Sequence, residues 1–149
     1  MYKVERAIIM AAGIGKRMNP VTLTTPKPLV KVNGKVMIET AIEALHKNGI
    51  YEIYVVVGYL KEQFAYLPEK FKGLSLIENP FYDSCNNISS LYVSRNHIDN
   101  TIILDGDQII YNPEILHPDF ERSGYNCIWT DSPTDEWGLS VENDIVVSC

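Results

Sequence analysis

The 149-residue sequence predicts an α/β fold in which a mainly parallel sheet is covered by helices on both faces, giving three layers. Short apolar runs of strand length alternate with segments whose apolar residues recur at helical spacing. This alternation is typical of crossover units in a parallel sheet. Several runs end directly at a glycine or at an Asp-Gly turn, as buried strands do.

The individual elements follow from the positions of these runs. Strands are expected at residues 7–10, 53–57, 74–77, 101–104, 127–130 and 145–147. Helices are expected at 38–45, ended by Gly49, at 60–67, stopped by Pro68, and at 88–92, with Ser84, Asn86 and Asn87 as capping candidates. Residues 13–28 are rich in Gly, Pro, Thr, Lys and Arg without periodicity, which predicts a long loop.

Residues 1–149 are expected to form one domain. The sequence stops at Cys149 directly after an apolar strand-like run, with no closing helix. We therefore expect it to represent the N-terminal and central part of a longer natural chain.

Composition and charge limit the class of protein. Lys and Arg number 13 and Asp and Glu number 19, which gives a net charge of −6 at pH 7 and argues against general nucleic-acid binding. No apolar run approaches the ~18–20 residues that span a bilayer, and the first residues do not resemble a signal peptide. Cys85, Cys127 and Cys149 form no close pair in the sequence, so neither a disulfide framework nor a zinc site is expected. This use of cysteine predicts a cytoplasmic protein.

The loop after the first strand is the leading candidate site, because ligands of such sheets bind at the carboxyl ends of the strands. It reads AAGIGKRMNP over residues 11–20 and TPKPL over residues 25–29. Small residues let backbone amides approach an anion, and nearby cations complete a triphosphate site. The small residues are Ala11, Ala12, Gly13 and Gly15, and the cations are Lys16, Arg17 and Lys27.

This loop matches neither of the two common phosphate-binding motifs. A Walker loop needs Ser or Thr where Arg17 stands, and the dinucleotide fingerprint needs Gly where Met18 stands. A second candidate site is the Asp-Gly-Asp turn after the strand at 101–104. Asp105 and Asp107 supply carboxylates, and a carboxylate beside a triphosphate suits Mg²⁺.

The loop resembles the signature of the nucleotide-diphospho-sugar transferase-like nucleotidyltransferases, which include the MobA-like NTP transferases. The resemblance implies a Rossmann-like, GT-A-like sheet and an enzyme that couples a nucleoside triphosphate to a phosphorylated small molecule, releasing pyrophosphate. It also implies that Arg17 lies against the β and γ phosphates, that Lys27 reaches the reacting phosphates, and that Asp107 ligates Mg²⁺, with Asp105 as a further candidate ligand.

The segments that meet the acceptor differ from those of sugar-1-phosphate enzymes. Residues 79–95 lack a Gly-Thr-Ala segment, and residues 131–147 lack a Glu-Lys-Pro motif. They instead resemble the CTP:phosphocholine cytidylyltransferases of bacterial choline-decoration pathways, through VGYLKEQFAYL at 57–67, NN-x-x-SLY at 86–92 and the Glu136-Trp137 pair. The resemblance implies phosphocholine, or a similar aminoalkyl phosphate or phosphonate, as the acceptor.

The residue types agree with such substrates. A cationic amine head binds well to aromatic faces and carboxylates, so Glu136, Trp137 and Tyr82 are the candidate acceptor residues. Asn side chains can pair with a pyrimidine edge. The candidate contacts to the base or ribose are Gly58, Tyr59, Asn86 and Asn87.

Two other functions stay open on the sequence. One is a sugar-1-phosphate nucleotidyltransferase. The other is a nucleotide-binding regulatory module that is catalytically silent because the chain is short.

Overall fold

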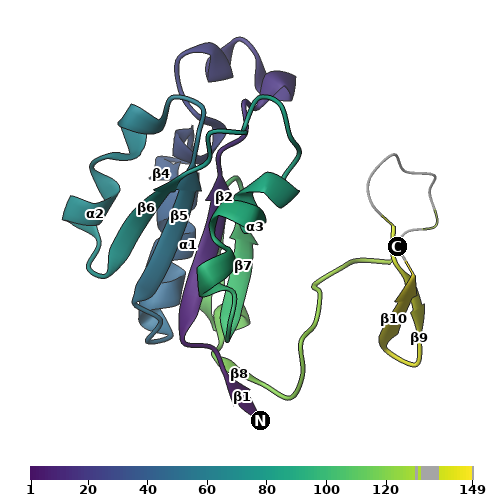
Figure 1. Cartoon of the computed structure of the whole chain (residues 1–149). Helices are drawn as coiled ribbons and strands as arrows, with labels where there is room; N and C mark the ends of the chain where they lie inside the picture. Colours follow the sequence, from purple (N-terminus) through teal and green to yellow (C-terminus); the bar gives the residue numbers. More distant parts are fainter. Residues whose placement is uncertain (130, 132–137, 149) are drawn as a thin grey trace.

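The molecule is built around a four-stranded sheet in which all strands are parallel, in the order β6-β5-β2-β7. The computed structural model describes residues 1–129, 131 and 138–148. Figure 1 shows β2 and β5 at the centre of this sheet. The strands are β2 (Arg6–Ala11), β5 (Glu52–Val57), β6 (Leu74–Glu78) and β7 (Thr101–Asp105).

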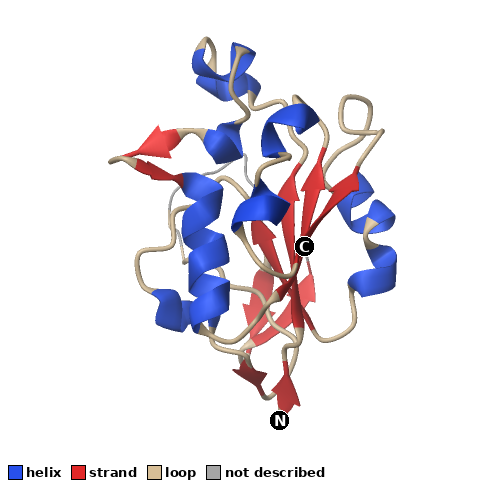
Figure 2. Ribbon diagram, turned by 90° about the vertical axis from the view of Figure 1, so that its left-hand side faces the viewer, coloured by secondary structure: helices blue, strands red, loops and turns tan. Residues whose placement is uncertain are grey.

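Helices lie on both faces of the sheet, which confirms the predicted three-layer α/β class. The main core joins alternate residues of β2, such as Ile9, to α1 (Met37–Lys47) and α2 (Leu67–Lys70). On the opposite face, Ile8 and Val56 pack with side chains that include Val93 of α3 (Ile88–Val93). Figure 2 shows the sheet nearly edge-on, with α1 on one side and α3 on the other. In the part of the chain that the structure describes, no helix is long and apolar enough to cross a membrane.

The amphipathic pattern of α1 explains its place in the core. Ile38, Ile42 and Leu45 recur at helical spacing and are wholly buried. The helix ends as predicted at Gly49, which has a φ of +76° and donates its amide to the carbonyl of His46 at 3.0 Å.

Three short antiparallel pairs surround this framework, and the sequence predicted only the last strand among them. Figure 1 shows the third pair standing away from the parallel sheet, and both of its strands are largely exposed. The pairs are β1 (Tyr2–Lys3) with β8 (Asp119–Phe120), β3 (Lys31–Val32) with β4 (Lys35–Val36), and β9 (Ser140–Glu142) with β10 (Ile145–Ser148).

Two sequence predictions about local structure are wrong. Residues 127–129 of the strand expected at 127–130 form no regular structure; residue 130 lies outside the described residues. Ile128 and Trp129 are 90% and 86% exposed, and a strand without a ladder partner has no hydrogen bonds to hold it. Pro68 does not stop a helix but lies in the first turn of α2, where no backbone donor is needed. The segment before it forms a 3-10 turn, Lys61–Phe64.

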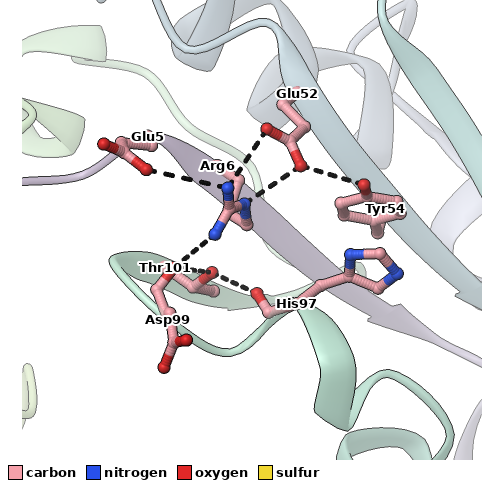
Figure 3. Close-up of polar contacts among 7 residues, drawn as sticks. All are labelled: Glu5, Arg6, Glu52, Tyr54, His97, Asp99 and Thr101. Carbon is pink, nitrogen blue, oxygen red and sulfur yellow. Dashed lines mark hydrogen bonds and ion pairs between the residues drawn. The ribbon is translucent and has the colours of Figure 1, made fainter.

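A polar cluster ties the strands together near their amino ends, opposite the edge where ligands bind in such sheets (Figure 3). The Arg6 guanidinium of β2 donates to the Glu52 carboxylate of β5 at 3.0 Å and to the carbonyl of Asp99 at 2.8 Å. The Tyr54 hydroxyl also donates to Glu52 at 2.9 Å, and the ring of His97 stacks on Tyr54 with centroids 3.8 Å apart. The cluster therefore joins β2, β5 and the turn that leads into β7.

The Glu52 carboxylate should make the stability that this polar cluster contributes depend on pH. Hydrogen bonds from Arg6 and then Tyr54 lower the pKa of Glu52 below its ordinary value of 4.5. The carboxylate thus stabilises the fold above that value, and the contribution disappears as the pH falls through the folded-state pKa. Glu52→Gln should cost about 0.2–1 kcal/mol near neutral pH, because the pair is exposed, and almost nothing in strong acid.

Urea unfolding of both proteins across this pH range measures the difference. Glu43→Gln is the matched control, since Glu43 is an exposed carboxylate of α1 with no ion pair among the described residues. A stability difference that stays constant with pH would contradict the assignment.

Candidate functional site

The carboxyl ends of the strands surround a hollow of about 110 Å³. It brings together the two segments that the sequence singled out, the loop after β2 and the Asp-Gly-Asp turn after β7, and adds the start of α3. The parallel register explains the meeting, because Met10 pairs with Asp105 in the ladder. The lining residues are Met10, Ala11, Ala12, Gly13, Gly15, Lys27, Pro28, Asn87, Ser90, Asp105 and Asp107.

A larger hollow of about 500 Å³ lies between the β3–β4 hairpin, α1 and α2, and it shares no residue with the first. Its Glu39 carboxylate is already satisfied by the Tyr66 hydroxyl at 2.9 Å and the Lys70 ammonium at 2.8 Å. We place the candidate site in the smaller hollow, because that one combines strand ends, close-approach glycines, a cation and carboxylates.

The loop after β2 is held in one shape by packing around Gly15. This residue has a φ of +70°, and a Cβ there would lie 3.1 Å from Thr22 and 3.3 Å from Lys27. The buried Thr22 hydroxyl donates to the Gly15 carbonyl and to the Asn19 side chain, each at 2.9 Å. The backbone of the loop is therefore organised before any ligand arrives. The loop after β2 contains three 3-10 turns, Lys16–Met18, Val21–Leu23 and Lys27–Leu29.

An ion pair closes the hollow between the loop and the Asp-Gly-Asp turn. The Lys27 ammonium donates to the Asp107 carboxylate at 2.5 Å, with both side chains about one-third exposed. Gly106 lets the turn approach β2, because its amide donates to the Met10 carbonyl at 2.9 Å and a Cβ would lie 3.0 Å from the same oxygen. The pair thus sits where the ends of β2 and β7 meet.

The charge on the Asp-Gly-Asp turn is only partly compensated. Partial withdrawal of the Asp105 carboxyl from water raises its pKa, the charge of Asp107 raises it further, and Lys27 opposes both effects. In the described residues, no group of three or more His, Cys, Asp or Glu side chains could hold a metal ion. These two carboxylates can hold a divalent cation only together with ligand oxygens or water.

The start of α3 forms the opposite part of the lining. The Asn86 side-chain oxygen accepts from the amide of Ile88, the first residue of α3, at 3.2 Å, while Asn87 is the N-cap residue and makes no side-chain capping bond. Asn87 lines the hollow, and its carboxamide makes no hydrogen bond within the described part of the chain. Ser90 also lines the hollow and is buried beneath Asn79. Neither Ser90 nor Asn79 was among the predicted site residues. Ser90 is the serine of the NN-x-x-SLY segment, and the signal for Asn79 was an Asn-Pro turn at a strand end.

Of the remaining predicted site residues, Gly58, Tyr59, Lys16 and Arg17 do not line the hollow. Gly58 is buried under Tyr82, and the Tyr59 amide donates to the Ala12 carbonyl at 3.1 Å. Both residues therefore support the loop after β2 without lining the hollow. Lys16 and Arg17 lie exposed at the first 3-10 turn. Glu136 and Trp137 lie outside the described residues.

The parallel sheet, the loop after β2 and the carboxylate turn after β7 together have the architecture of a nucleotidyltransferase domain. The profile of the MobA-like NTP transferase domain matches residues 7–136, and the chain belongs to this family.

Individual relatives extend this result. The chain is 46% identical over 139 residues to a 2-aminoethylphosphonate cytidylyltransferase of Lancefieldella rimae, covering 92% of this chain and 56% of the relative. It is 42% identical over 142 residues to a choline-phosphate cytidylyltransferase of Streptococcus pneumoniae, covering 95% and 61%. The chain thus spans less than two thirds of the length of these curated relatives.

Solved structures confirm the fold. The CTP:phosphocholine cytidylyltransferase LicC from Streptococcus pneumoniae matches with a TM-score of 0.86 and 42% identity, over 96% of this chain and 64% of that one. A nucleotidyl transferase from Methanothermobacter thermautotroptrophicus, at 24% identity, shows the same fold with a TM-score of 0.59 over 73% of this chain and 53% of that one.

The packing of Gly58 yields a stability prediction. A Cβ at this position would lie 2.6 Å from the Cβ of Tyr82, so Gly58→Ala must displace Tyr82 and its loop. We expect a loss of about 1–3 kcal/mol in the free energy of unfolding, measured in urea. Gly13→Ala is the control, because nothing lies within 4 Å of a Cβ there. Equal stability of the two variants would contradict the packing seen here.

Proposed function

We propose that this chain forms the nucleotide-binding part of a cytidylyltransferase, which joins the CMP unit of CTP to phosphocholine or a similar aminoalkyl phosphate or phosphonate and releases pyrophosphate. The observation that carries the proposal is the hollow at the strand ends, where a preorganised glycine loop faces Lys27 and two carboxylates. The named activities of the two curated relatives favour CTP and an amine-bearing acceptor. The exposed free thiols of Cys85 and Cys127 suit a cytoplasmic location.

The residues of the hollow divide the chemistry between them. The acceptor phosphate oxygen attacks the α-phosphorus of CTP in line, and pyrophosphate leaves, so no covalent enzyme intermediate is needed. Backbone amides near Gly13 and Gly15 face the leaving phosphates, with Arg17 at the outer end of the same loop. Lys27 neutralises charge on the reacting oxygens, and rate enhancement comes from positioning and electrostatics.

We also propose that Asp107, with Asp105 beside it, holds Mg²⁺ during the reaction. The site fits a cation, because Asp107 already binds the Lys27 ammonium and a second carboxylate, Asp105, lines the same hollow. Partial burial raises the pKa of Asp105, the charge of Asp107 raises it further, and Lys27 lowers it. Hard carboxylate oxygens are the ligands that Mg²⁺ prefers, and the bound ion would neutralise charge on the phosphates. Mn²⁺ binding to the nucleotide-bound protein measures this independently of turnover.

The acceptor end of the proposal rests on Glu136, Trp137 and Tyr82. Tyr82 is half-buried over Gly58, while the other two lie outside the described residues. An amine head bound to an aromatic face and a carboxylate explains why an acidic, aromatic pair follows the nucleotide site in the sequence.

Pyrophosphate release tests the function directly. Protein containing this chain is incubated with each nucleoside triphosphate, Mg²⁺ and, in parallel, phosphocholine, phosphoethanolamine, 2-aminoethylphosphonate or glucose-1-phosphate. We expect release with CTP and an amine acceptor. Release with the sugar phosphate alone would select a sugar-1-phosphate enzyme, and CTP binding without any release would select a catalytically silent module.

Replacement of Lys27 tests the phosphate site. Lys27→Ala should lower turnover by about 10²–10³, the usual effect of removing one preorganised charge-stabilising donor. Lys72→Ala is the matched control, since Lys72 is an exposed cation outside the hollow. Turnover of Lys27→Ala close to that of the wild type would exclude a role for this lysine in the reaction.

Replacement of Asp107 tests the metal site. Asp107→Asn keeps the size of the side chain but removes the charge that a hard divalent cation prefers, so Mg²⁺-dependent turnover should collapse. CTP affinity without metal, measured by calorimetry, should change little. If Asp105→Asn proves the more damaging change, the principal ligand is Asp105.

Replacement of Trp137 tests the acceptor site. A desolvated cation on a Trp face contributes about 2 kcal/mol, so Trp137→Ala should weaken acceptor binding by roughly tenfold to thirtyfold. The affinity for CTP should stay almost unchanged. An equal loss of both affinities would mean that Trp137 supports the fold instead of the acceptor.

A further inference from the structure

A buried asparagine connects the sheet to the lining of the hollow. Asn79 follows β6 directly and is only 1% exposed. Its side-chain amide donates to the hydroxyls of Ser89 at 2.9 Å and Ser90 at 3.2 Å, and its side-chain oxygen accepts from the Phe81 amide at 2.9 Å. Its own backbone amide donates to the Val57 carbonyl at 2.8 Å. Both polar ends of the carboxamide are therefore used inside the protein.

These bonds fix both ends of the segment between β6 and α3. The bond from the Phe81 amide to Asn79 holds the beginning of the segment. At its end, the Ser89 hydroxyl donates to the Asn86 carbonyl at 2.8 Å. Between these points residues 80–87 form turns, and most of their side chains are exposed. The position of Asn87 and Ser90 in the hollow is thus held by the hydrogen bonds of Asn79 together with the packing of Tyr82 on Gly58.

The geometry points to Asn79 as a positioning residue for the nucleoside, and we propose that it sets the affinity for CTP without touching the ligand. Asn79 does not line the hollow, whereas Ser90 and Asn87 do, and the Asn87 carboxamide makes no hydrogen bond to any described residue. Uncharged donors and acceptors suit a base and a ribose, while the glycine loop and Lys27 suit phosphates. This inference rests on the proposed nucleotide-binding function.

The two linings of the hollow are then held by different hydrogen bonds. Thr22 and Gly15 organise the glycine loop, while Asn79 organises the start of α3. Only a carboxamide offers two N–H donors and an acceptor to the three partners found here. Its loss should displace the α3 lining and leave the loop in place.

Calorimetry with two ligands separates these linings. Asn79→Ala should bind CTP roughly 10- to 100-fold more weakly than the wild type, the usual cost of leaving buried hydrogen-bonding groups unsatisfied. Its affinity for inorganic tripolyphosphate, a ligand with no base or ribose, should stay within about twofold. Ser94→Ala is the matched control, because Ser94 is a wholly buried residue that follows α3, and among the described residues its hydroxyl bonds only to the helix carbonyls of Ser90 and Leu91. It should keep both affinities.

A double-mutant cycle tests the route of the effect. Asn79→Ala and Ser89→Ala remove the two ends of one hydrogen bond, and Ser89→Ala also removes the bond to the Asn86 carbonyl. The double variant should therefore lose less CTP affinity than the sum of the two single variants. If Asn79→Ala does not fold, Ser89→Ala carries the test, with a smaller loss for CTP and none for tripolyphosphate.

The possible outcomes separate a failure of this inference from a failure of the proposed cytidylyltransferase function. An equal loss of both ligands in a folded variant would make Asn79 a general stabiliser of the site and overturn the inference. Unchanged CTP affinity would overturn it as well. Both results leave the proposed function standing, whereas a wild-type protein that binds neither ligand would contradict the proposed function itself.

Discussion

The parallel register of the central sheet is the constraint on which the rest of the structure depends. Ala11 of β2 pairs with Val57 of β5, and Met10 pairs with Asp105 of β7. All three strands therefore end at one edge, and the loops that leave them converge there. The Lys27–Asp107 ion pair joins two of these loops across 80 residues of sequence, and the polar cluster around Arg6 holds the same strands near their other end.

Groups of both signs meet at this edge of the sheet. The protein carries a net charge of −6, and at the strand ends Lys27, the loop amides and the nearby Arg17 lie beside the carboxylates of Asp105 and Asp107. An anionic ligand would meet these groups with little reorganisation, because Gly15 and Thr22 already fix the loop. The protein would thus supply a prepared electrostatic site, while the reacting phosphates supply the bond changes.

Elements with strong periodicity could be predicted from the sequence, and elements defined by tertiary contacts could not. The four parallel strands and α1 carry apolar runs or helical spacing, and the loop and Asp-Gly-Asp turn follow from the strand-end rule. Strands of two residues, such as β3 and β4, show no period. The expected strand at 127–130 had the right composition but no partner for residues 127–129. The link between Asn79 and Ser90 depends on a tertiary contact between the turn after β6 and α3, which no sequence period reveals.

Amide chemical-shift mapping with CTP and Mg²⁺ tests the central claim most directly, that the carboxyl edge of the sheet is the triphosphate site. Gly13, Gly15 and Gly106 report on the hollow at the strand ends, while Gly34 reports on the larger hollow beside α1. The account predicts saturable shifts at the first three residues and none at Gly34. Shifts centred on Gly34, with Gly13 and Gly106 unmoved, would contradict it.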